Sequence, residues 1–551
     1  MERPWIQHYD PGVPATLIYP AVPVHRFFEQ AAQQYPERAC TVFQDHTITY
    51  RQMEALVDRL ARGLVTLGVR KGDRVAVMMP NLPQFVLSFY AILKAGGVVV
   101  ALNPLYQHTE LEYQLGDSGA RTLIALRSFA GLIQSVRAKT ALETLVWTDV
   151  EDAFRLTDAL DEGGGAVVES AEPALLDLLR SSPAGAELPA VGAEDVAIYQ
   201  YSGGTTGIPK GAVGLHRNLV ANTLMFRHWL VGLEAGREVV LAAIPLFHVY
   251  GMVIAMSVGV YLGATLVLVP SPRNIEEVLR NIETYRATLF PGVPNLYQAI
   301  NNHPNVVGGK VKLGSIKACI SGSAPLLAET KADFERFTGG KLMEGYGLSE
   351  APTATHCNPM LGENRVGSIG LPLPDVDCRI VDLETGLRDL PVGEAGELIV
   401  RSPQVMQGYH NRPDETEIAL RDGWLYTGDI AYMDGDGYFY LIDRKKELIK
   451  IGGLQVWPRE VEEVLMAHPA VKEAAAAGVP DPVRVEVVKA WVVAKPGASL
   501  NVDDVREWCG RHLARYKIPS LVEFRTELPR TLVGKVLRRE LVRQHKEGIR
   551  V

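Results

Sequence analysis

Short apolar runs alternate with stretches of helical periodicity through the first part of the chain. The runs Val75–Met79 and Val98–Leu102 are rich in Val, and Phe85–Leu93 between them has its apolar residues at helical spacing. Further short runs occur at 123–126, 197–199 and 318–320. Strands that are apolar on both faces belong to parallel sheets covered by helices. The pattern therefore predicts an α/β fold with parallel βαβ subdomains.

The pattern of hydrophobic and polar residues changes after about Gly362. Short alternating runs at 378–381 and 396–400, with frequent Gly and Pro, predict a small β unit. A charged segment at 441–447 follows, and such a segment is typical of a solvated linker or of a hinge. We expect a large N-terminal domain over 1–442, a hinge at 443–447 and a mobile, smaller α+β domain over 448–551.

The smaller domain is predicted to contain both helices and strands. Pro458 opens a helix that continues to Met466, since proline is favoured in a first turn. The other predicted elements are strands at 475–477 and 487–493, a helix at 502–514 and a helix near the end.

The segment Val239–Pro272 is long and apolar, and His248 is its only ionisable side chain near neutral pH. Its length would suffice for a membrane span. Prolines and glycines interrupt it, however, at 245, 251, 259, 263 and 270. These breaks favour a strand ending near Pro245, a buried helix and a short strand at 264–269.

Composition narrows the classes of function. The chain has 551 residues, 47% of them hydrophobic, and a formal net charge of −8, which argues against a nucleic-acid binder. Its five cysteines lack the spacing of a zinc site or a disulfide framework, which favours a reducing compartment. The first residues lack the pattern of a signal peptide, so we expect a cytoplasmic location.

The segment Tyr201–Gly211 combines glycines, hydroxyl groups and Lys210. Glycines expose backbone N–H groups, and Ser and Thr hydroxyls add donors, so the segment suits a polyphosphate. It is not a Walker A loop, because Pro209 precedes the lysine and no Ser or Thr follows it. Taken alone, the segment is also compatible with a surface turn.

Four further segments complete a predicted nucleotide site: Pro245–His248, Glu344–Glu350, Tyr426–Asp429 and Arg530–Lys535. A tyrosine between glycines can stack on a purine, and a carboxylate such as Asp429 can accept from ribose hydroxyls. Glu350 can help to hold Mg²⁺, and Lys535 supplies positive charge.

In this order, these segments resemble the adenylate-forming superfamily of acyl-CoA synthetases, aryl-CoA ligases, firefly luciferase and peptide-synthetase adenylation domains. The resemblance covers nearly the whole chain. Residues 422–429 continuing to 442–446 resemble the signature of fatty acyl-CoA synthetases, especially bacterial long-chain-fatty-acid–CoA ligases. The segments 103–106, 367–372, 516–519 and 521–525 add to this likeness.

The resemblance implies a two-step reaction that uses ATP, Mg²⁺ and coenzyme A. A carboxylate attacks the α-phosphorus of ATP to give an acyl-adenylate and pyrophosphate, and the thiol of coenzyme A then displaces AMP. No covalent enzyme intermediate is required, so catalysis is expected from alignment and charge neutralisation.

The resemblance also assigns roles to residues of the nucleotide site. Thr206 and Glu350 would lie near the metal, Tyr346 would stack on adenine, and Asp429 and Arg444 would hold the ribose. The residues that would bind the phosphates are Ser202, Gly203, Gly204, Thr205, Thr206, Gly207 and Lys210. Gly322, Ser323 and Ala324 would lie along the adenine edge and the acyl pocket, and Glu344, Gly345 and Gly347 would help to bind ATP or AMP.

The remaining roles concern the acid, the hinge and the thiol. His248 would border the acyl tunnel, and Lys535 would bridge the carboxylate and the α-phosphate during adenylation. Lys446 falls at the hinge position. Lys450, Gln455 and Gly453 would contact the adenylate or the pantetheine arm in the second step.

Structural interpretations compete with some of these roles. His248 and Tyr346 would also be explained as core residues. The cations around Lys535, namely Arg538, Arg539, Arg543 and Lys546, are expected to form a solvated helix face. Gly203 stands where many relatives have serine, and Gly452 stands where aryl-CoA ligases have lysine, which puts the details of their thioester step in doubt here.

Three other functions compete with that of a medium- to long-chain fatty acid–CoA ligase. A coumarate-type aryl-CoA ligase shares the chemistry but has a different pocket. An adenylation domain would be followed by a carrier-protein segment. A non-catalytic nucleotide-binding lipid carrier has no need of Lys535, Glu350 and Asp429 together. Chain-length preference, a homodimer and peripheral contact with the inner membrane face stay open.

Overall fold

The chain forms two compact units. The computed structural model describes residues 3–161, 170–181, 186–202, 209–451, 454–481, 485–531 and 534–548. The first unit comprises Met1–Asp377 and Arg401–Leu425, and the second comprises Cys378–Val400 and Tyr426–Val551. The two units are defined by how their residues pack and carry no information on motion. The domain boundaries at 442 and 448 and the hinge between them therefore stay predictions.

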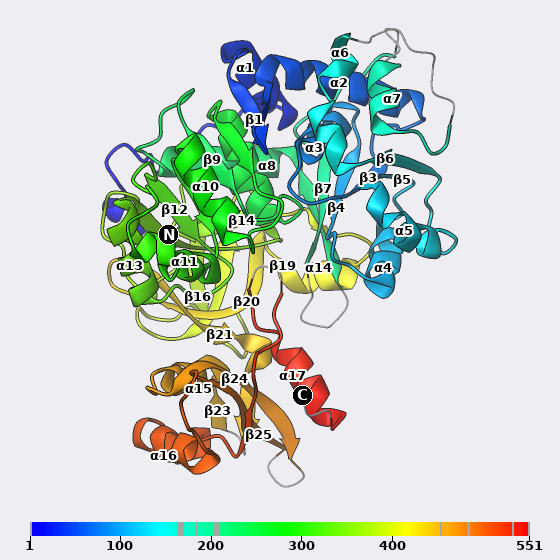
Figure 1. Cartoon of the computed structure of the whole chain (residues 1–551). Helices are drawn as coiled ribbons and strands as arrows, with labels where there is room; N and C mark the ends of the chain where they lie inside the picture. The colour runs from blue at the N-terminus through cyan, green and yellow to red at the C-terminus, as the bar shows by residue number, and fades with distance from the viewer. Residues whose placement is uncertain are drawn as a thin grey trace. The chain divides into compact units, whose positions relative to one another are not determined.

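A nine-stranded sheet forms one layer of the first unit (Figure 1). Its strands lie in the order β15 (Leu371–Pro372), β14 (Ala351–Cys357), β13 (Lys341–Leu348), β12 (Ala318–Ser321), β11 (Leu289–Gly292), β9 (Val239–Ala242), β10 (Thr265–Leu268), β1 (Ala39–Phe43) and β2 (His46–Thr49). Neighbours from β13 to β1 are parallel, and the outer pairs are antiparallel. Apolar side chains of four helices pack on this sheet: α10 (Ile275–Tyr285), α11 (Pro294–Asn301), α12 (Pro304–Val307) and α13 (Ala328–Thr338).

A seven-stranded sheet forms the second layer of this unit. Its order is β18 (Gly408–Tyr409), β8 (Lys210–Leu215), β7 (Val196–Ser202), β4 (Val98–Leu102), β3 (Arg74–Met78), β5 (Thr122–Leu126) and β6 (Thr144–Thr148). The strands from β7 to β6 are parallel, whereas β8 is antiparallel to both of its neighbours, β18 and β7. Helices α4 (His108–Ser118) and α5 (Ala130–Arg137) pack on this sheet.

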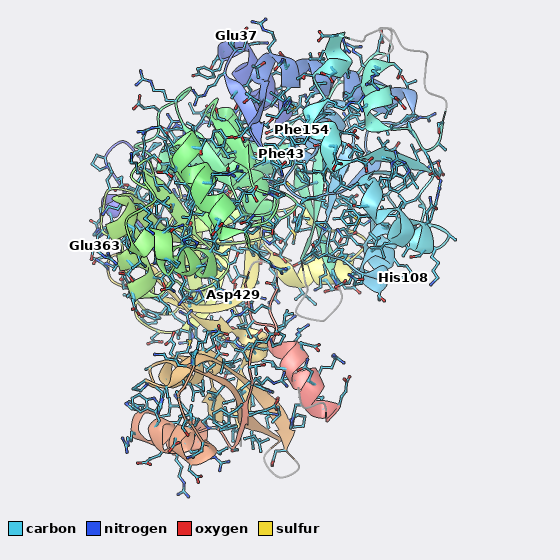
Figure 2. The ribbon with its side chains drawn as sticks, in the orientation of Figure 1. Glu37, Phe43, His108, Phe154, Glu363 and Asp429 are labelled. Carbon is cyan, nitrogen blue, oxygen red and sulfur yellow. The ribbon has the colours of Figure 1, made fainter. Side chains whose placement is uncertain are left out.

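The two sheets share a core. Helix α3 (Pro83–Lys94) contacts strands of both sheets and is buried from Pro83 to Leu93, as expected of a helix that is apolar all round. Phe43 of β1 and Phe154 lie beside each other with ring centroids 5.8 Å apart (Figure 2). The first unit is therefore one packed body with two sheets.

Some of the other helices of the first unit lie at its surface and some lie in its interior. They are η1 (Pro4–His8), α1 (His25–Gln34), α2 (Tyr50–Thr66), η2 (Arg127–Phe129), η3 (Val150–Phe154), α6 (Asp158–Asp161), α7 (Leu175–Arg180), α8 (His216–Trp229), the π-helix η4 (Gly251–Ser257), α9 (Val258–Tyr261) and α14 (Pro413–Ala419). Helix α2 begins with a capping box, in which the Thr49 and Gln52 side chains each accept from the other residue's backbone N–H.

The predicted strand, buried helix and strand within Val239–Pro272 are confirmed. Strand β9 ends at Ala242, η4 and α9 follow as a buried helical segment, and β10 covers Thr265–Leu268. Over the residues that the structure describes, no helix combines the length and the apolar character that crossing a membrane requires.

The second unit contains two sheets. In one, β16 (Asp377–Val381), β17 (Gly396–Arg401) and β20 (Trp424–Met433) lie side by side, and β21 (Phe439–Arg444) pairs with β20. The short strand β19 (Leu420–Arg421) pairs with the first residues of β20, within the first unit. The other sheet is ordered β23 (Leu454–Val456), β22 (Ile449–Ile451), β25 (Val485–Ala494) and β24 (Val471–Asp481), with β26 (Leu521–Phe524) paired to β25.

Helices cover both faces of the β22–β26 sheet. Helices α15 (Pro458–Met466) and α16 (Val502–His512) pack on one face, and α17 (Arg538–Lys546) packs on the other (Figure 1). Two short 3-10 helices are η5 (Lys445–Glu447) and η6 (Arg515–Lys517). The helix predicted from Pro458 has the predicted bounds. The observed sheets confirm the predicted fold class of a large α/β part, a small β region and a smaller α+β part.

Candidate active site

The carboxyl ends of three parallel strands bring predicted site residues together in the first unit. Gly292 of β11, Ser321 of β12 and Glu344 of β13 occupy paired register positions. Gly322–Ala324 follows β12, whereas 345–348 is the rest of β13, beyond its parallel pairing with β12, and Glu350 follows that strand. Ligands of α/β sheets bind beyond this edge, so the sheet places both segments where a nucleotide would be bound.

The glycines around Tyr346 have a packing reason. A Cβ atom on Gly347 would lie 1.7 Å from the carbonyl oxygen of Thr353 in β14, so a side chain has no room there. Tyr346 is partly exposed, and its ring meets that of His356 edge to face at 5.8 Å. Glu344 is buried, and its carbonyl oxygen accepts from the backbone and side-chain amides of Asn358 at 3.0 and 3.2 Å. Adenine stacking by Tyr346 stays a prediction.

Tyr250 joins the predicted acyl-pocket residues. Its hydroxyl lies 2.6 Å from the carbonyl oxygen of Ile320, and its ring would lie 3.4 Å from a Cβ on Gly322. Its backbone N–H donates to Nδ1 of His248 at 3.2 Å. Burial lowers the pKa of His248 to about 4, so the ring is neutral near pH 7 with Nδ1 as acceptor. These contacts are compatible with both the core and the acyl-tunnel interpretations.

Two residues after Gly322 also belong to the predicted set. Ser323 is exposed with φ of 72°, a left-handed conformation uncommon for a residue with a side chain, and Ala324 is partly buried.

The predicted phosphate segment lies between two antiparallel strands. Ser202 ends β7, Lys210 begins β8, and the two are paired in register. The residues Gly203, Gly204, Thr205, Thr206 and Gly207 lie outside the described residues, so their predicted contacts with phosphate are not tested. Tyr201 and Tyr113 brace the ends of the segment, since Tyr201 donates to Asp117 at 2.7 Å and Tyr113 to the carbonyl oxygen of Pro209 at 2.8 Å.

Tyr409 connects this hairpin with Glu350. The ammonium group of Lys210 lies 5.1 Å from the centre of the Tyr409 ring and forms an ion pair with Glu415 at the start of α14. The Tyr409 hydroxyl donates to Oε1 of Glu350 at 2.8 Å, and the backbone N–H of Met406 donates to the Glu350 carbonyl oxygen at 2.8 Å. The structure thus brings Lys210 and Glu350 to one place.

Sequence reasoning missed Tyr409 and Glu415. They lie about 60 residues beyond Glu350 in a segment with the Gly and Pro content of an ordinary loop. Only the pairing of β18 with β8 brings them next to Lys210, and that pairing has no local sequence signal.

Glu350 is the carboxylate predicted to bind a magnesium ion at this point. Mg²⁺ binds through one or two carboxylates together with phosphate oxygens, so Glu350 beside Lys210 fits such an ion. Among the described residues, no three His, Cys, Asp or Glu side chains gather into a metal-binding group. The predicted second ligand, Thr206, lies outside the described ranges.

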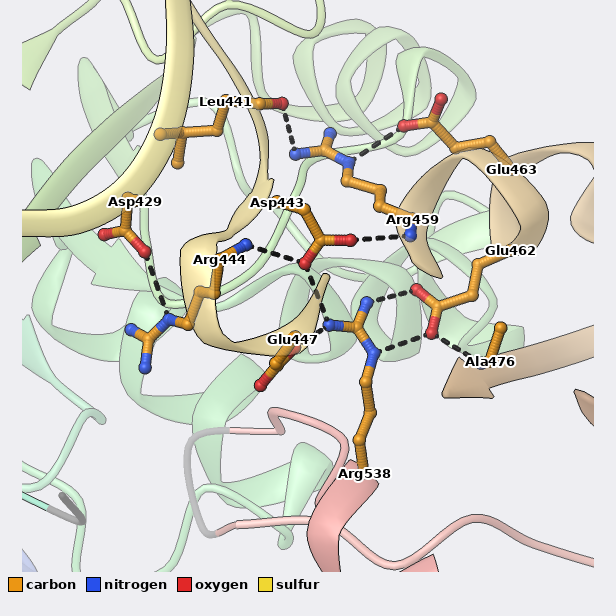
Figure 3. Close-up of polar contacts among 10 residues, drawn as sticks. All are labelled: Asp429, Leu441, Asp443, Arg444, Glu447, Arg459, Glu462, Glu463, Ala476 and Arg538. Atoms are coloured by element: carbon orange, nitrogen blue, oxygen red, sulfur yellow. Dashed lines mark hydrogen bonds and ion pairs between the residues drawn. The ribbon is translucent and has the colours of Figure 1, made fainter. Parts of the chain in front are cut away.

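Asp429 and Arg444 face each other across two strands of the second unit. They are paired in register between β20 and β21, and Nε of Arg444 lies 3.1 Å from Oδ1 of Asp429 (Figure 3). Asp429 is buried. The predicted ribose pair is therefore preassembled by strand pairing, since strand partners bring side chains of one face together.

Lys535 lies in a closed turn near the same pair. Its carbonyl oxygen accepts from the N–H of Thr531 at 2.8 Å, and its N–H donates to the Thr531 hydroxyl at 3.1 Å. Burial and the positive charge of Arg444 lower the pKa of Lys535, while Glu447 and Asp429 act against this effect. Lys535, Arg444 and Asp429 thus form one charged group within the second unit.

The residues predicted for the second step lie on a different hairpin. Lys450 is exposed in the middle of β22 and is paired in register with Gln455 of β23. Its neighbours Ile449 and Ile451 are buried, so by strand alternation Lys450 faces the other way. Gly453 lies outside the described residues. Lys446 is exposed in η5, and its hinge role is not tested.

The predicted solvated face around Lys535 is wrong for Arg538. Its side chain is 19% exposed and forms ion pairs with Asp443, Glu447 and Glu462 (Figure 3). Arg543 on the same helix, at 54% exposed, and the exposed Arg539 and Lys546 fit the prediction. A run of basic residues cannot show which of them meets buried carboxylates from other segments.

Known proteins resemble the chain over nearly its whole length. It is 41% identical over 557 residues to a long-chain-fatty-acid–CoA ligase of Bacillus subtilis, covering 99% of both chains. It is 38% identical to the ligase of the same name from Salmonella typhimurium, covering 98% of both chains. It is also 37% identical over 500 residues to a feruloyl-CoA synthase of Amycolatopsis, covering 90% of this chain and 94% of that one.

A solved structure and two family models agree with this similarity. The crystal structure of ATP-bound MatB from Rhodopseudomonas palustris has a TM-score of 0.83 and 30% identity, covering 96% of this chain and 100% of that one. The model of the AMP-binding enzyme family matches residues 28–410, and that of the AMP-binding enzyme C-terminal domain matches residues 460–535. The chain therefore belongs to the AMP-binding enzyme family.

Proposed function

We propose that the chain is an ATP-dependent fatty acid–CoA ligase that converts a medium- to long-chain fatty acid, ATP and coenzyme A into acyl-CoA, AMP and pyrophosphate. In the first step, a carboxylate oxygen bonds to the α-phosphorus of ATP as the bond to pyrophosphate breaks. In the second step, the coenzyme A sulfur bonds to the acyl carbon, AMP leaves, and the thiol proton is released.

The observation that carries the proposal is the junction of Lys210, Tyr409 and Glu350. It places a cation from the glycine-rich hairpin beside a carboxylate at the carboxyl edge of the nine-stranded sheet. A triphosphate with its magnesium ion needs both kinds of charge next to a base-binding edge. The two long-chain-fatty-acid–CoA ligases that resemble the chain end to end support the choice of substrate.

The first step depends on alignment and on neutralised charge. Lys210 and the segment from Ser202 to Gly207 would hold the β- and γ-phosphates, and Asp429 and Arg444 would hold the ribose. Lys535 would bridge the fatty acid carboxylate and the α-phosphate, where its ammonium group stabilises the developing negative charge. Mg²⁺, held by Glu350 and Thr206, would neutralise phosphate oxygens.

The second step would use a different set of residues from the second unit, in place of Lys535. Lys450 and Gln455 would contact the adenylate, Gly453 would leave room for the pantetheine arm, and a turn about Lys446 would exchange the two sets of residues. A closure of this kind exposes different faces of one domain to one site.

The nearest alternative is an aryl-CoA ligase, and the resemblance to a feruloyl-CoA synthase favours it as the second candidate. The chemistry is the same and only the acid differs. A non-catalytic lipid carrier is the candidate from another class. We place the enzyme in the cytoplasm, with contact at the inner membrane face where an insoluble fatty acid is available.

Acid-dependent exchange of pyrophosphate into ATP tests the proposal. The assay would compare short, medium and long fatty acids with coumarate and ferulate, each with and without Mg²⁺. Exchange with medium or long fatty acids is the expected result. Exchange with the aryl acids alone would move the protein to the aryl-CoA ligases, and no exchange with any acid would contradict a ligase.

A further inference from the structure

Arg538 is a charged side chain enclosed by three segments of the second unit. It begins α17, three residues after Lys535. Its guanidinium donates to both carboxylate oxygens of Glu462 in α15, at 2.8 and 2.5 Å, and forms ion pairs with Asp443, at 3.3 Å, and with Glu447 (Figure 3). One side chain therefore joins α17, α15 and the segment 443–447.

The carboxylates around Arg538 are themselves held in place. Asp443 has a side chain that is 2% exposed, and it accepts from the backbone N–H groups of Arg444 and Arg459 at 2.7 and 2.8 Å. Glu462 also accepts from the N–H of Ala476 at 2.8 Å. Burial raises the pKa of both carboxyl groups, and the Arg538 charge opposes that effect. Asp443 and Glu462 are thus each held by Arg538 and by backbone N–H groups, and a polar network of this kind fixes geometry.

A buried ion cluster is a poor source of stability. The desolvation of its charges offsets most of their attraction, and apolar side chains of similar volume often stabilise a fold as well. A four-residue cluster at this place therefore favours a role in holding segments in one arrangement.

The turn that carries Lys535 is anchored on both sides. Before it, Arg530 forms an ion pair with Glu473 of β24 at 2.8 Å and donates to the carbonyl oxygen of Gly534 at 2.7 Å. Within it, the N–H of Leu537 donates to the carbonyl oxygen of Pro529 at 2.8 Å. After it, Arg538 provides the link to the 443–447 segment. Arg530 fixes the turn to the sheet, whereas Arg538 fixes it to the predicted hinge.

We propose that Arg538 is a positioning residue for the adenylation step, which fixes the Lys535 turn to Asp443 and Glu447 on either side of Lys446. The inference rests on the proposed function, in which Lys535 acts in the first step only. Arg538 does not touch the substrate. It acts by setting the position of the Lys535 side chain. A displacement of a catalytic group by about 1 Å costs about 100-fold in rate.

Arg538→Lys tests this role, because lysine keeps the charge but lacks the planar fork that contacts three carboxylates at once. Pyrophosphate exchange should fall about ten-fold or more, because the variant should displace Lys535 by a fraction of the distance that costs about 100-fold. Transfer of a supplied acyl-adenylate to coenzyme A should stay within about two-fold of the wild type, since Lys535 has no part in it. Arg543→Lys, on the exposed face of the same helix, is the matched control and should change neither rate.

Glu447→Gln is the second variant, because it weakens one of the two contacts with the hinge segment and leaves Asp443 and Glu462 paired. It should lower exchange more than transfer, with a melting temperature close to that of the wild type. Equal loss of both half-reactions in this variant, or no loss of either, would overturn the inference. No exchange by the wild-type enzyme would instead contradict the proposed function.

Discussion

Several side chains of the candidate site carry or lose charge according to their surroundings. Burial and Arg444 lower the pKa of Lys535, burial keeps His248 neutral, and the Tyr409 hydroxyl is fixed on Glu350. Perturbed groups of this kind gather at functional sites because catalysis needs charge in places where water is largely excluded.

Lys535→Ala should abolish adenylate formation, with a loss of about 100-fold or more in pyrophosphate exchange, because it removes the charge at the α-phosphate. The variant should still transfer a supplied acyl-adenylate to coenzyme A. Lys546→Ala, an exposed lysine of α17, is the control. Equal loss of both half-reactions would contradict the division of labour.

The same lysine predicts a pH dependence. The protonated form is required, and it is lost as pH rises through a pKa that lies below the ordinary lysine value. Exchange should therefore decline at a lower alkaline pH than a lysine with the ordinary pKa would give, while transfer keeps its rate over that range. Rate profiles of the two half-reactions above neutral pH would measure this difference.

Tyr409→Phe should raise the Mg²⁺ concentration that gives half-maximal exchange by several-fold. The hydroxyl that holds Glu350 would be missing, and a hydrogen bond to a charged group contributes about 1.5–3 kcal/mol. The maximal rate at saturating Mg²⁺ should change less. Tyr285→Phe removes a surface hydrogen bond to Asp45 and is the control. An unchanged Mg²⁺ dependence would show that Tyr409 does not position Glu350.

At the scale of elements, strand pairing does most of the assembly. The pairing of β20 with β21 sets Asp429 against Arg444, and the pairing of β8 with β18 sets Lys210 against Tyr409. The strands of the first pair follow each other along the chain, so the motifs that they carry could be recognised in the sequence. The strands of the second pair lie about 200 residues apart, so their pairing could not be predicted from the sequence.

A hinge at Lys446 would act between neighbouring elements of the second unit. Lys446 lies in η5, between Asp443 and Glu447, which Arg538 holds. Lys446→Pro should stiffen the backbone, because proline fixes φ, and should slow thioester formation more than adenylation. Lys446→Ala, which keeps the backbone free, is the control. The ratio of the two rates decides, and an unchanged ratio in the proline variant counts against a hinge at this residue.

At the scale of the whole molecule, the first unit keeps four histidines neutral in its interior. Burial lowers the pKa of His25 and His248 to about 4 and of His216 and His356 to about 3. In the unfolded chain these groups bind protons near pH 6.5. The stability that they contribute is complete above that pH and is lost as pH falls.

The melting temperature of the first unit should therefore fall steeply from about pH 6.5 to 5, with each histidine contributing about 1.4 kcal/mol per pH unit. Calorimetry across this range would measure the slope. His216→Asn, whose amide oxygen can replace Nδ1 as the acceptor from Val24, should reduce the slope by about one proton. His108→Gln at the surface is the control, and an equal slope in both variants would contradict the assignment.

Most of the elements, the fold class and most of the candidate residues could be predicted from the sequence. Val-rich runs, proline in the first turn of α15 and the order of the motifs are local properties, and local properties can be recognised along one chain. Which distant groups meet became evident only in the folded chain. It placed Tyr409 between Lys210 and Glu350 and enclosed Arg538, because long-range strand pairing and burial depend on the whole fold and no single segment encodes them.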